Sequence, residues 1–275
     1  MAIAMLVCTL GDLTLDVIVR LAGPIAPGGD TDAEIQIGPG GQAANVAAWV
    51  AELGAAARFV GKTGADQSGA LVRERLSAFG VEIVGPVEGR NGSICSLVSP
   101  AGDRSMAADR ASARELRPDE LEPAWFAGCT HLHVSGYALM VEPVRSAALR
   151  AAGIARAEGA HVSLDLASWS AIRDSGVEAF RESARALAPE VVFANEEEER
   201  VVGAIDAAWI RKRGAAGCTF DGDDHPAVEV ERVLDSTGAG DALAAGWLVG
   251  GPELALEAAA RCIQQLGAMP VASER

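Results

Sequence analysis

The feature that most constrains the fold is an alternation of short apolar segments with longer, helix-like segments along most of the chain. After Gly54, short apolar segments that indicate strands alternate with longer segments whose hydrophobic periodicity indicates helices. The strand candidates are 57–60, 131–134 and 161–166, and the helix candidates are 68–79, 141–157 and 177–188. This alternation predicts an α/β fold, with a mainly parallel sheet covered by helices on both faces. Sheets of this kind bind ligands at the carboxyl ends of their strands.

The N-terminal apolar segment, residues 5–11, is typical of a buried first strand that ends in a glycine turn. Asp12, Asp16 and Arg20 interrupt the apolar sequence that follows, well short of the ~20 residues of a membrane-spanning helix. The start also lacks the pattern of a signal peptide. We therefore expect a cytoplasmic protein.

Two segments, 17–37 and 93–107, break the alternation because they contain strand candidates without intervening helices. Together they predict a small separate β-sheet. A chain of 275 residues with 49% hydrophobic residues can bury one large core. We expect a single domain over residues 1–275, with the small sheet as an appendage.

The formal net charge of -15 argues against a nucleic-acid or anionic-membrane partner, because either would be repelled over most of the surface. A nucleotide is not excluded, since helix N-termini, Mg²⁺ and a few basic residues can hold it locally. The five cysteines are scattered and contain no Cys-x-x-Cys pair, which indicates reduced core residues.

The motif Asp-Ser-Thr-Gly-Ala-Gly-Asp-Ala at 235–242 precedes an apolar, helix-like segment. A Gly-Ala-Gly turn at a helix start exposes backbone N–H groups at the positive end of the helix dipole, where a phosphate-like anion binds. A carboxylate beside such an anion, Asp241, suggests a group that accepts a proton from an attacking hydroxyl. Taken separately, a turn glycine or a helix-start Asp is more typical of a capped helix than of an anion site, and only the combination favours the anion site.

A second motif, Gly-Pro-Gly-Gly-Gln-Ala-Ala-Asn-Val-Ala at 38–47, also precedes a helix, and 53–54 and 59–66 follow in order. With the motif at 235–241, these segments resemble the ribokinase-like, or PfkB, carbohydrate kinase family across most of the chain. The resemblance implies a three-layer α/β sandwich with a β-sheet lid over the sugar. It also implies an ATP-dependent kinase, a transferase with an alcohol group as acceptor.

The resemblance assigns roles by position. Asp241 matches the catalytic base, and the backbone of three residues matches the anion hole: Gly238, Ala239 and Gly240. The substrate-binding candidates are Asp16, Gly40, Gly41 and Asn45, with Arg104 on the lid. Arginine suits an acidic or phosphorylated substrate. An exposed arginine on a lid strand is the alternative for Arg104.

The nucleotide-side candidates are Asn195 and Glu198, which match an Asn-x-x-Glu element that acts near Mg²⁺ through water, and the glycines Gly214 and Gly217. Asp235 matches a position that helps to hold a monovalent cation, so we expect K⁺ activation. The alternative for Asp235 is a strand-end residue that organises the turn.

The leading hypothesis is phosphorylation of a small ribose-, fructose- or keto-deoxy-sugar-acid-like substrate, with ATP and Mg²⁺. The segment 165–168 lacks the arginine of some sugar-acid kinases, which weakens the case for a sugar acid. The segment 199–213 is short and ends in charged residues, which is unusual for residues that contact adenine. A nucleoside (adenosine-like) kinase and a catalytically silent sugar- or nucleotide-binding relative remain open. The resemblance also allows a homodimer through the lid.

Overall fold

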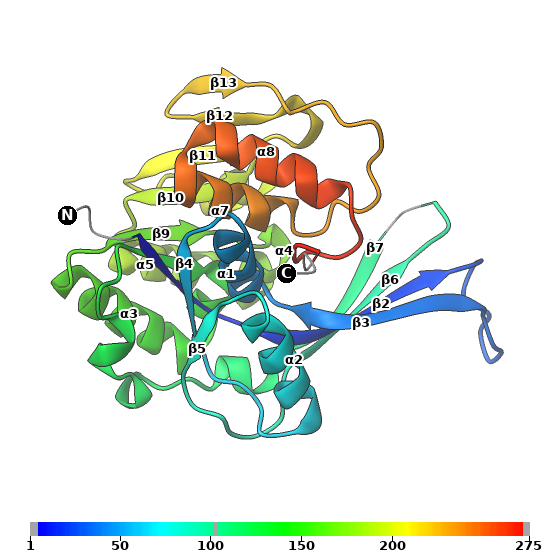
Figure 1. Ribbon diagram of the computed structural model, residues 1–275, viewed down its shortest axis with the longest axis horizontal. Helices are drawn as coiled ribbons and strands as arrows, with labels where there is room; N and C mark the ends of the chain where they lie inside the picture. The colour runs from blue at the N-terminus through cyan, green and yellow to red at the C-terminus, as the bar shows by residue number, and fades with distance from the viewer. Residues whose placement is uncertain (1–4, 102–103, 272–275) are drawn as a thin grey trace.

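A computed structural model describes residues 5–101 and 104–271. Within these residues, the strands of the main sheet follow the order β13-β12-β11-β10-β9-β8-β1-β4-β5 (Figure 1). Their bounds are β1 Leu6–Leu10, β4 Ala56–Val60, β5 Glu82–Val84, β8 His131–Ser135, β9 His161–Asp165, β10 Val191–Asn195, β11 Ala208–Lys212, β12 Cys218–Phe220 and β13 Asp223–His225. All pairs from β5 to β11 are parallel, and β12 and β13 extend the sheet in antiparallel fashion.

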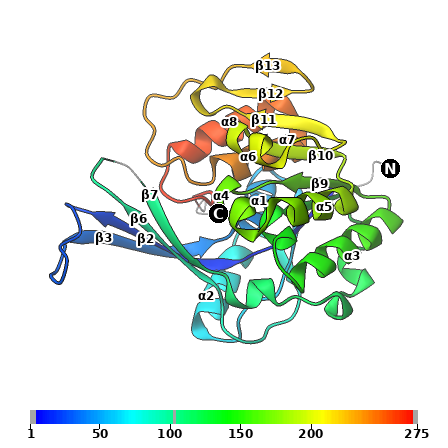
Figure 2. The same cartoon turned by 180° about the vertical axis from the view of Figure 1, so that it is seen from behind.

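Helices cover both faces of this sheet, as expected when parallel strands are joined by helical crossovers (Figures 1 and 2). The helices are α1 Gln42–Glu52, α2 Gln67–Ser77, α3 Val144–Ala157, α4 Trp169–Ser175, α5 Val177–Leu187, α6 Glu196–Val202, α7 Ala239–Gly250 and α8 Pro252–Ile263. Short 3₁₀ turns are η1 Ala111–Arg114, η2 Pro118–Glu120, η3 Pro123–Phe126, η4 Gly136–Leu139 and η5 Gly214–Ala216.

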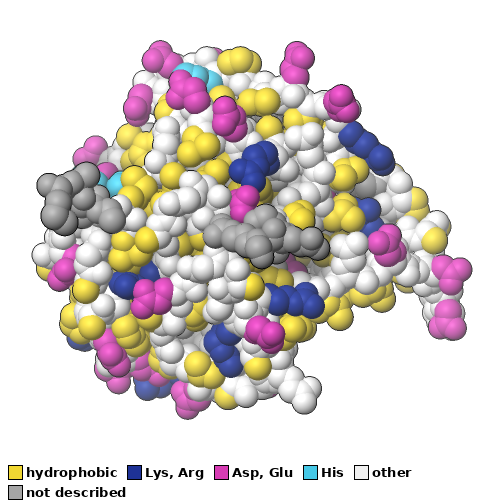
Figure 3. All heavy atoms as spheres, viewed as in Figure 1, with side chains coloured by type: hydrophobic (Ala, Val, Ile, Leu, Met, Phe, Trp, Pro, Cys, Tyr) yellow, Lys and Arg dark blue, Asp and Glu magenta, His cyan; other side chains and the backbone are white. Residues whose placement is uncertain are grey.

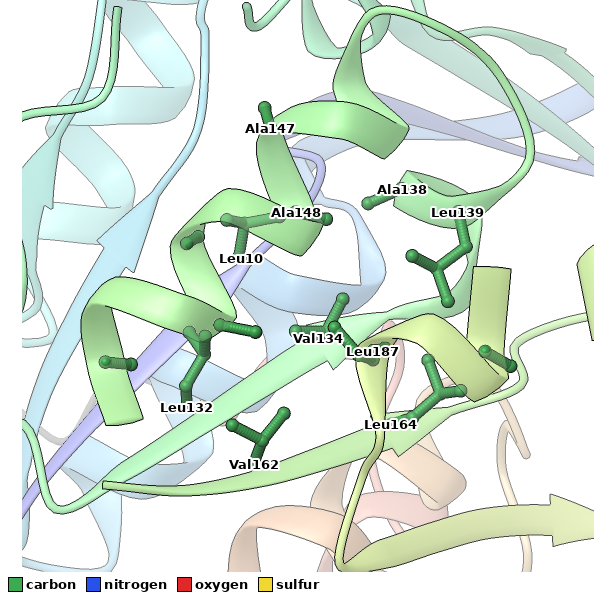
Figure 4. Close-up of a cluster of buried hydrophobic side chains, with 14 of the residues drawn as sticks. Leu10, Leu132, Val134, Ala138, Leu139, Ala147, Ala148, Val162, Leu164 and Leu187 are labelled. Atoms are coloured by element: carbon green, nitrogen blue, oxygen red, sulfur yellow. The ribbon is translucent and has the colours of Figure 1, made fainter. Parts of the chain in front are cut away.

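The core is divided by the sheet into two apolar clusters. One joins the sheet to α3, α4, α5 and α6, and Figure 4 shows Leu132, Val134 and Leu164 of its strands packed against helical alanines. The other joins the sheet to α1, α2, α7 and α8 and contains the fully buried Trp49. The Trp49 indole donates to the Ala268 carbonyl over 2.8 Å, which ties α1 to the C-terminal segment.

A separate four-stranded sheet, the lid, projects from one end of the molecule (Figure 1). Its order is β3-β2-β6-β7, with β2 Thr14–Leu21, β3 Ala33–Gly40, β6 Ser93–Val98 and β7 Arg104–Asp109. β2 and β6 are parallel, and the two outer pairs are antiparallel. Residues 102 and 103, within the segment 93–107 assigned to the lid, lie outside the described residues.

The predicted α/β class with a small additional sheet is confirmed, and each strand and helix candidate falls on an element of the same type. The helix predicted from residue 141 begins at Val144, because the preceding Pro143 fixes its backbone and occupies the N-cap. The pairing of β2 with β3 runs from Thr14↔Gly40 to Leu21↔Ala33, so the two strands extend beyond both ends of the predicted segment 17–37.

The described cysteines are free thiols, four of them buried, as predicted for reduced core residues. None of the helices in the described part of the chain has the length and apolar character needed to span a membrane. Acidic, basic and apolar side chains are interspersed on the face shown in Figure 3.

Candidate active site

The carboxyl ends of the central strands bring polar side chains to one edge of the main sheet. β9 ends at Asp165, β10 at Asn195 and β11 at Lys212. Asn195 is directly opposite Lys212 in the parallel register. This edge also receives the start of α7, so the parts of the chain that carry charge and the helix dipole lie together.

The start of α7 is fixed by a turn that requires glycine. Gly238 is the N-cap and has φ +77°, and a Cβ there would lie 2.5 Å from the Cβ of Ala268. The Asp235 carboxylate accepts from the Thr237 N–H at 2.9 Å and the Gly267 N–H at 3.1 Å. The first N–H groups of a helix have no partner inside the helix and can bind an anion, although the Ala239 N–H donates to the Ser236 carbonyl over 3.4 Å.

Asp241 lies in the first turn of α7 and contacts α1. Its Oδ2 accepts from Asn45 Nδ2 at 2.7 Å, which joins two residues 196 positions apart. Burial, followed by the nearby charge of Asp165, raises the pKa of Asp241 from 3.8 to about 7, although the Asn45 hydrogen bond and Lys212 lower it. A carboxyl group with this pKa is suited to exchange a proton near neutral pH.

Asp16 is the second carboxyl group of this region and comes from the lid strand β2. Its Oδ1 accepts from the Thr14 hydroxyl at 2.8 Å, and burial raises its pKa from 3.8 to about 6. Gly40 makes room for it, because a Cβ on Gly40 would lie 2.1 Å from the Asp16 carboxyl carbon. Gly41 is the N-cap of α1 and has φ +101°. A Cβ on Gly41 would lie 2.4 Å from the Asp12 carbonyl oxygen.

An apolar cavity of about 560 Å³ lies on one side of the α7 start. Gly214, Gly217 and Gly240 line it together with side chains of α8 and the segment before α7. Gly217 has φ +93°, and a Cβ there would lie 2.0 Å from the His225 carbonyl oxygen. The two glycines predicted for the nucleotide side thus face the same cavity as the glycine of the anion turn.

A smaller cavity of about 240 Å³, the lid cavity, lies between the lid and the C-terminal segment. Asp16, Phe79, Arg104 and Asp235 are among its lining residues. Arg104 Nη1 lies 3.4 Å from Asp235 Oδ1, so the lid strand β7 is joined by an ion pair to the turn before α7. Asp235 therefore organises the turn through hydrogen bonds and contacts the lid as well.

Asn195 and Glu198 form a reciprocal cap at the start of α6. The Glu198 N–H donates to Asn195 Oδ1 and the Asn195 N–H donates to Glu198 Oε2, both at 2.9 Å. Glu198 is nearly completely buried, and burial together with the charge of Asp165 raises its pKa, while Lys212 opposes that rise. The predicted pair is adjacent to the Lys212 ammonium rather than on a solvated acidic surface.

Lys212 and Asp165 were absent from the predicted site residues. The Lys212 ammonium lies 2.8 and 3.1 Å from the two carboxylate oxygens of Asp165, which is fully buried. The neighbouring arginines point elsewhere, since Arg211 pairs with Glu199 and Arg213 with Asp224. Of the three charged residues at the end of β11, which were unexpected beside an adenine site, only Lys212 lines the apolar cavity. The rest of that cavity lining is mainly apolar.

A second buried ion pair closes the base of the lid. Arg110 contacts the Asp12 carboxylate, and its guanidinium carbon lies 3.4 Å from the centroid of the Tyr137 ring. Burial lowers the pKa of Arg110. The sequence signal for this pair was weak, because Asp12 resembles an ordinary turn residue and Arg110 follows an exposed strand.

Asp235 and Thr237 line the lid cavity, and Ser236, Ala239 and Gly240 line the apolar cavity, so both cavities border the turn that leads to Asp241. The α/β sandwich with its separate lid is a ribokinase-like fold. The chain belongs to the PfkB family: it matches the family described as pfkB family carbohydrate kinase over residues 4–274.

Several named proteins are similar to this chain. An ATP-dependent ribose-1-phosphate kinase of Halopiger xanaduensis is 32% identical, over 93% of this chain and 90% of that protein. Fructokinase-1 of Zea mays is 30% identical, over 86% of this chain and 80% of that protein. The crystal structure of adenosine kinase from Sinorhizobium meliloti superimposes with a TM-score of 0.82 at 25% identity, covering 98% and 97% of the two chains.

Proposed function

We propose that this protein transfers the γ-phosphoryl group of ATP to a hydroxyl of a small sugar, with Asp241 as general base. The observation that carries the proposal is the position of Asp241, in the first turn of a helix whose preceding turn borders both cavities, with a pKa raised to about 7. A sugar in the lid cavity and a nucleotide in the apolar cavity would meet at this carboxylate.

In the proposed reaction, the acceptor hydroxyl gives its proton to Asp241 as its oxygen attacks the γ-phosphorus. The bond between that phosphorus and the β,γ-bridging oxygen breaks, and ADP leaves. The backbone N–H groups at Gly238, Ala239 and Gly240 would stabilise the charge on the phosphoryl oxygens. Asn45 holds the Asp241 carboxylate in place through the 2.7 Å hydrogen bond.

The apolar cavity is the proposed nucleotide site, with Gly214 and Gly217 in its wall. Within the described residues, no group of three or more His, Cys, Asp or Glu side chains is arranged to hold a metal ion. Mg²⁺ would therefore bind mainly to phosphate oxygens and water, with Glu198 contacting that water. Bound there, Mg²⁺ would neutralise charge on the phosphates.

A neutral sugar such as ribose or fructose is the favoured acceptor class. The two arginines near the lid are already paired, Arg104 with Asp235 and Arg110 with Asp12. A sugar acid or phosphosugar would have to compete with these carboxylates for the guanidinium groups. The keto-deoxy sugar acid considered from the sequence is therefore the weaker proposal.

A nucleoside acceptor is the second candidate. Phe79 and Met106 line the lid cavity, where they would contact a base, and the similar solved structure is named an adenosine kinase. A catalytically silent relative is the third, and the proximity of Asp241, Asn45 and the anion turn argues against it.

The test is ADP release with Mg-ATP and a panel of acceptors: ribose, fructose, ribose-1-phosphate, 2-keto-3-deoxygluconate and adenosine. We expect turnover with a neutral sugar and its loss in Asp241→Asn. Turnover confined to adenosine would replace the sugar proposal with the nucleoside one. Absence of both ATP binding and turnover would favour the silent relative, and full activity of Asp241→Asn would exclude the proposed base.

We also propose a homodimer through the lid. Ile35 and Ile37 share one face of β3 and are 58% and 51% exposed. Exposed apolar side chains in a row on a sheet face are typical of an interface. Ile37→Glu should convert a dimer to a monomer in sedimentation, and a monomeric wild-type protein would refute this.

The role of Asp235 in holding K⁺ stays a prediction. Its carboxylate already accepts from Thr237 and Gly267 and pairs with Arg104, which supports the turn-organising alternative. Replacing Na⁺ by K⁺ at constant ionic strength should raise kcat if the cation site exists, whereas equal rates would leave Asp235 with the structural role.

A further inference from the structure

The Lys212 ammonium lies against the start of α7. Lys212 is the last residue of β11, and only 17% of its side chain is exposed. A Cβ built on Gly240 would lie 3.4 Å from Lys212 Nζ and 3.4 Å from its Cδ. Lys212 and Gly240 also line the same apolar cavity. A positive side chain therefore occupies the space beside the backbone N–H groups that would receive a phosphate.

This cation is held in a strongly acidic environment. Burial alone would lower the pKa of Lys212, but Asp165, Glu198 and Asp241 together raise it. The ammonium therefore stays charged at any physiological pH. An ammonium has three N–H donors, and the two contacts with Asp165 leave a third donor for another acceptor.

The same acidic environment is unfavourable for a triphosphate. A γ-phosphoryl group near the α7 start would approach the carboxyl groups of Asp165, Glu198 and Asp241, whose ionised forms repel it. If the only role of Lys212 were to neutralise Asp165, the ion pair could lie anywhere in the core. Lys212 instead makes its pair at the wall of the cavity, beside Gly240, where one face of the ammonium is open to a ligand.

We propose that Lys212 is a further catalytic residue, which donates to an oxygen of the transferring phosphoryl group beside Gly240, and that Asp165 is the positioning residue that holds it there. The inference rests on the proposed function. Lys212 keeps its three protons throughout, because the hydroxyl proton goes to Asp241. Lys212 contributes a positive charge that is in position before the reaction starts, so the protein does not have to reorganise in the transition state.

The test compares the binding of ATP and ADP, each with Mg²⁺ and without acceptor, by titration calorimetry. A charged hydrogen bond to the γ-phosphoryl group predicts that Lys212→Met weakens ATP about 10- to 100-fold and ADP less than about twofold. With acceptor present, kcat should fall about 10²- to 10³-fold. A purely structural lysine would weaken both nucleotides equally, so the ATP-to-ADP ratio separates the two roles.

Two further variants keep the experiment decisive. Lys212→Met leaves Asp165 buried and unpaired, so the double variant Asp165→Asn with Lys212→Met restores a neutral pair if the single variant does not fold. Lys62→Met is the matched control, because Lys62 is the other lysine of the chain and is buried in ion pairs with Glu88 and Glu120. The double variant should lose the ATP preference, and Lys62→Met should retain it.

An unchanged ATP-to-ADP ratio in the folded double variant would overturn the inference. So would a wild-type protein that binds both nucleotides equally, even if it phosphorylates a sugar. A wild-type protein that prefers ATP through Lys212 but turns over none of the acceptors would leave the inference standing and refute the proposed acceptor class. Failure of one proposal is thus distinguishable from failure of the other.

Discussion

Replacing Asp241 by Asn should remove activity and at the same time stabilise the fold. The raised pKa of Asp241, about 7 instead of 3.8, means that the folded state binds this proton more tightly than the unfolded state does. The stability that depends on the proton is complete below the unfolded pKa and is lost as the pH rises through the folded pKa. Asn is neutral at every pH, so the variant avoids this loss.

The size of the effect follows from the shift. About three pKa units at about 1.4 kcal/mol each give a cost of up to about 4 kcal/mol for the ionised carboxylate above about pH 8. At about pH 5.5 the cost is about 2 kcal/mol, because the folded protein still holds the proton. The advantage of Asp241→Asn in the free energy of unfolding should therefore grow by about 2 kcal/mol between these two pH values.

Urea denaturation of both proteins at the two pH values measures this difference, provided that the m-values agree. Asp235→Asn is the matched control, since hydrogen bonds from Thr237 and Gly267 hold the pKa of Asp235 below its ordinary value despite its burial. That substitution should lower stability by about the same amount at the two pH values, because Asp235 is ionised in the folded and the unfolded state at both. The same Asp241→Asn protein should lose about 10²- to 10⁴-fold in kcat. A variant that is less stable than wild type at both pH values would refute the argument that burial of this carboxylate is costly.

Three further predictions concern the rest of the site. Gly240→Ala should fold normally, because the nearest atoms to its Cβ belong to Lys212 at 3.4 Å, but its kcat should fall about 10²-fold. Gly238 has φ +77°, and its Cβ would lie 2.5 Å from Ala268, so Gly238→Ala should instead lose about 1–3 kcal/mol of stability in urea denaturation. Asn45→Ala removes a hydrogen bond that lowers the pKa of Asp241, so the acidic limb of the pH dependence of kcat should move to higher pH, and an unmoved limb would contradict the assignment of the base. Ala260→Phe should fill the apolar cavity and raise KM for ATP at least about tenfold while leaving KM for the sugar within about twofold, whereas equal changes would argue against the nucleotide site.

The sequence predicts the α/β class and the anion turn because both depend on local patterns. Periodicity marks the strands and helices, and the glycines around Asp241 mark a turn in which Gly238, at φ +77°, has a backbone conformation that favours glycine. Asp16 and Asn45 were found through motif positions, and the structure brings Asn45 into contact with Asp241. These residues share the property that their local surroundings in the sequence are unusual.

Lys212 and Asp165 could not be found in this way, because their significance depends on the sheet order. They are 47 positions apart, at the ends of β11 and β9, and become neighbours across β10. A signal was present, since Lys212 is one of two lysines in the chain and ends a strand just before Gly214. It was ambiguous, because Arg211 and Arg213 flank it and only the structure shows that both are paired elsewhere.

The acidity of the site and the proposed phosphate chemistry are compatible because few of the carboxyl groups need to be charged together. The pKa values of Asp16 and Asp241, about 6 and about 7, allow each to hold a proton over part of the neutral range, and burial raises that of Glu198 as well. The buried charge that remains at Asp165 is matched by Lys212. Asp241 must be ionised to accept the hydroxyl proton, so the reduced repulsion of the incoming phosphate comes from Asp16 and Glu198, whose pKa values burial also raises.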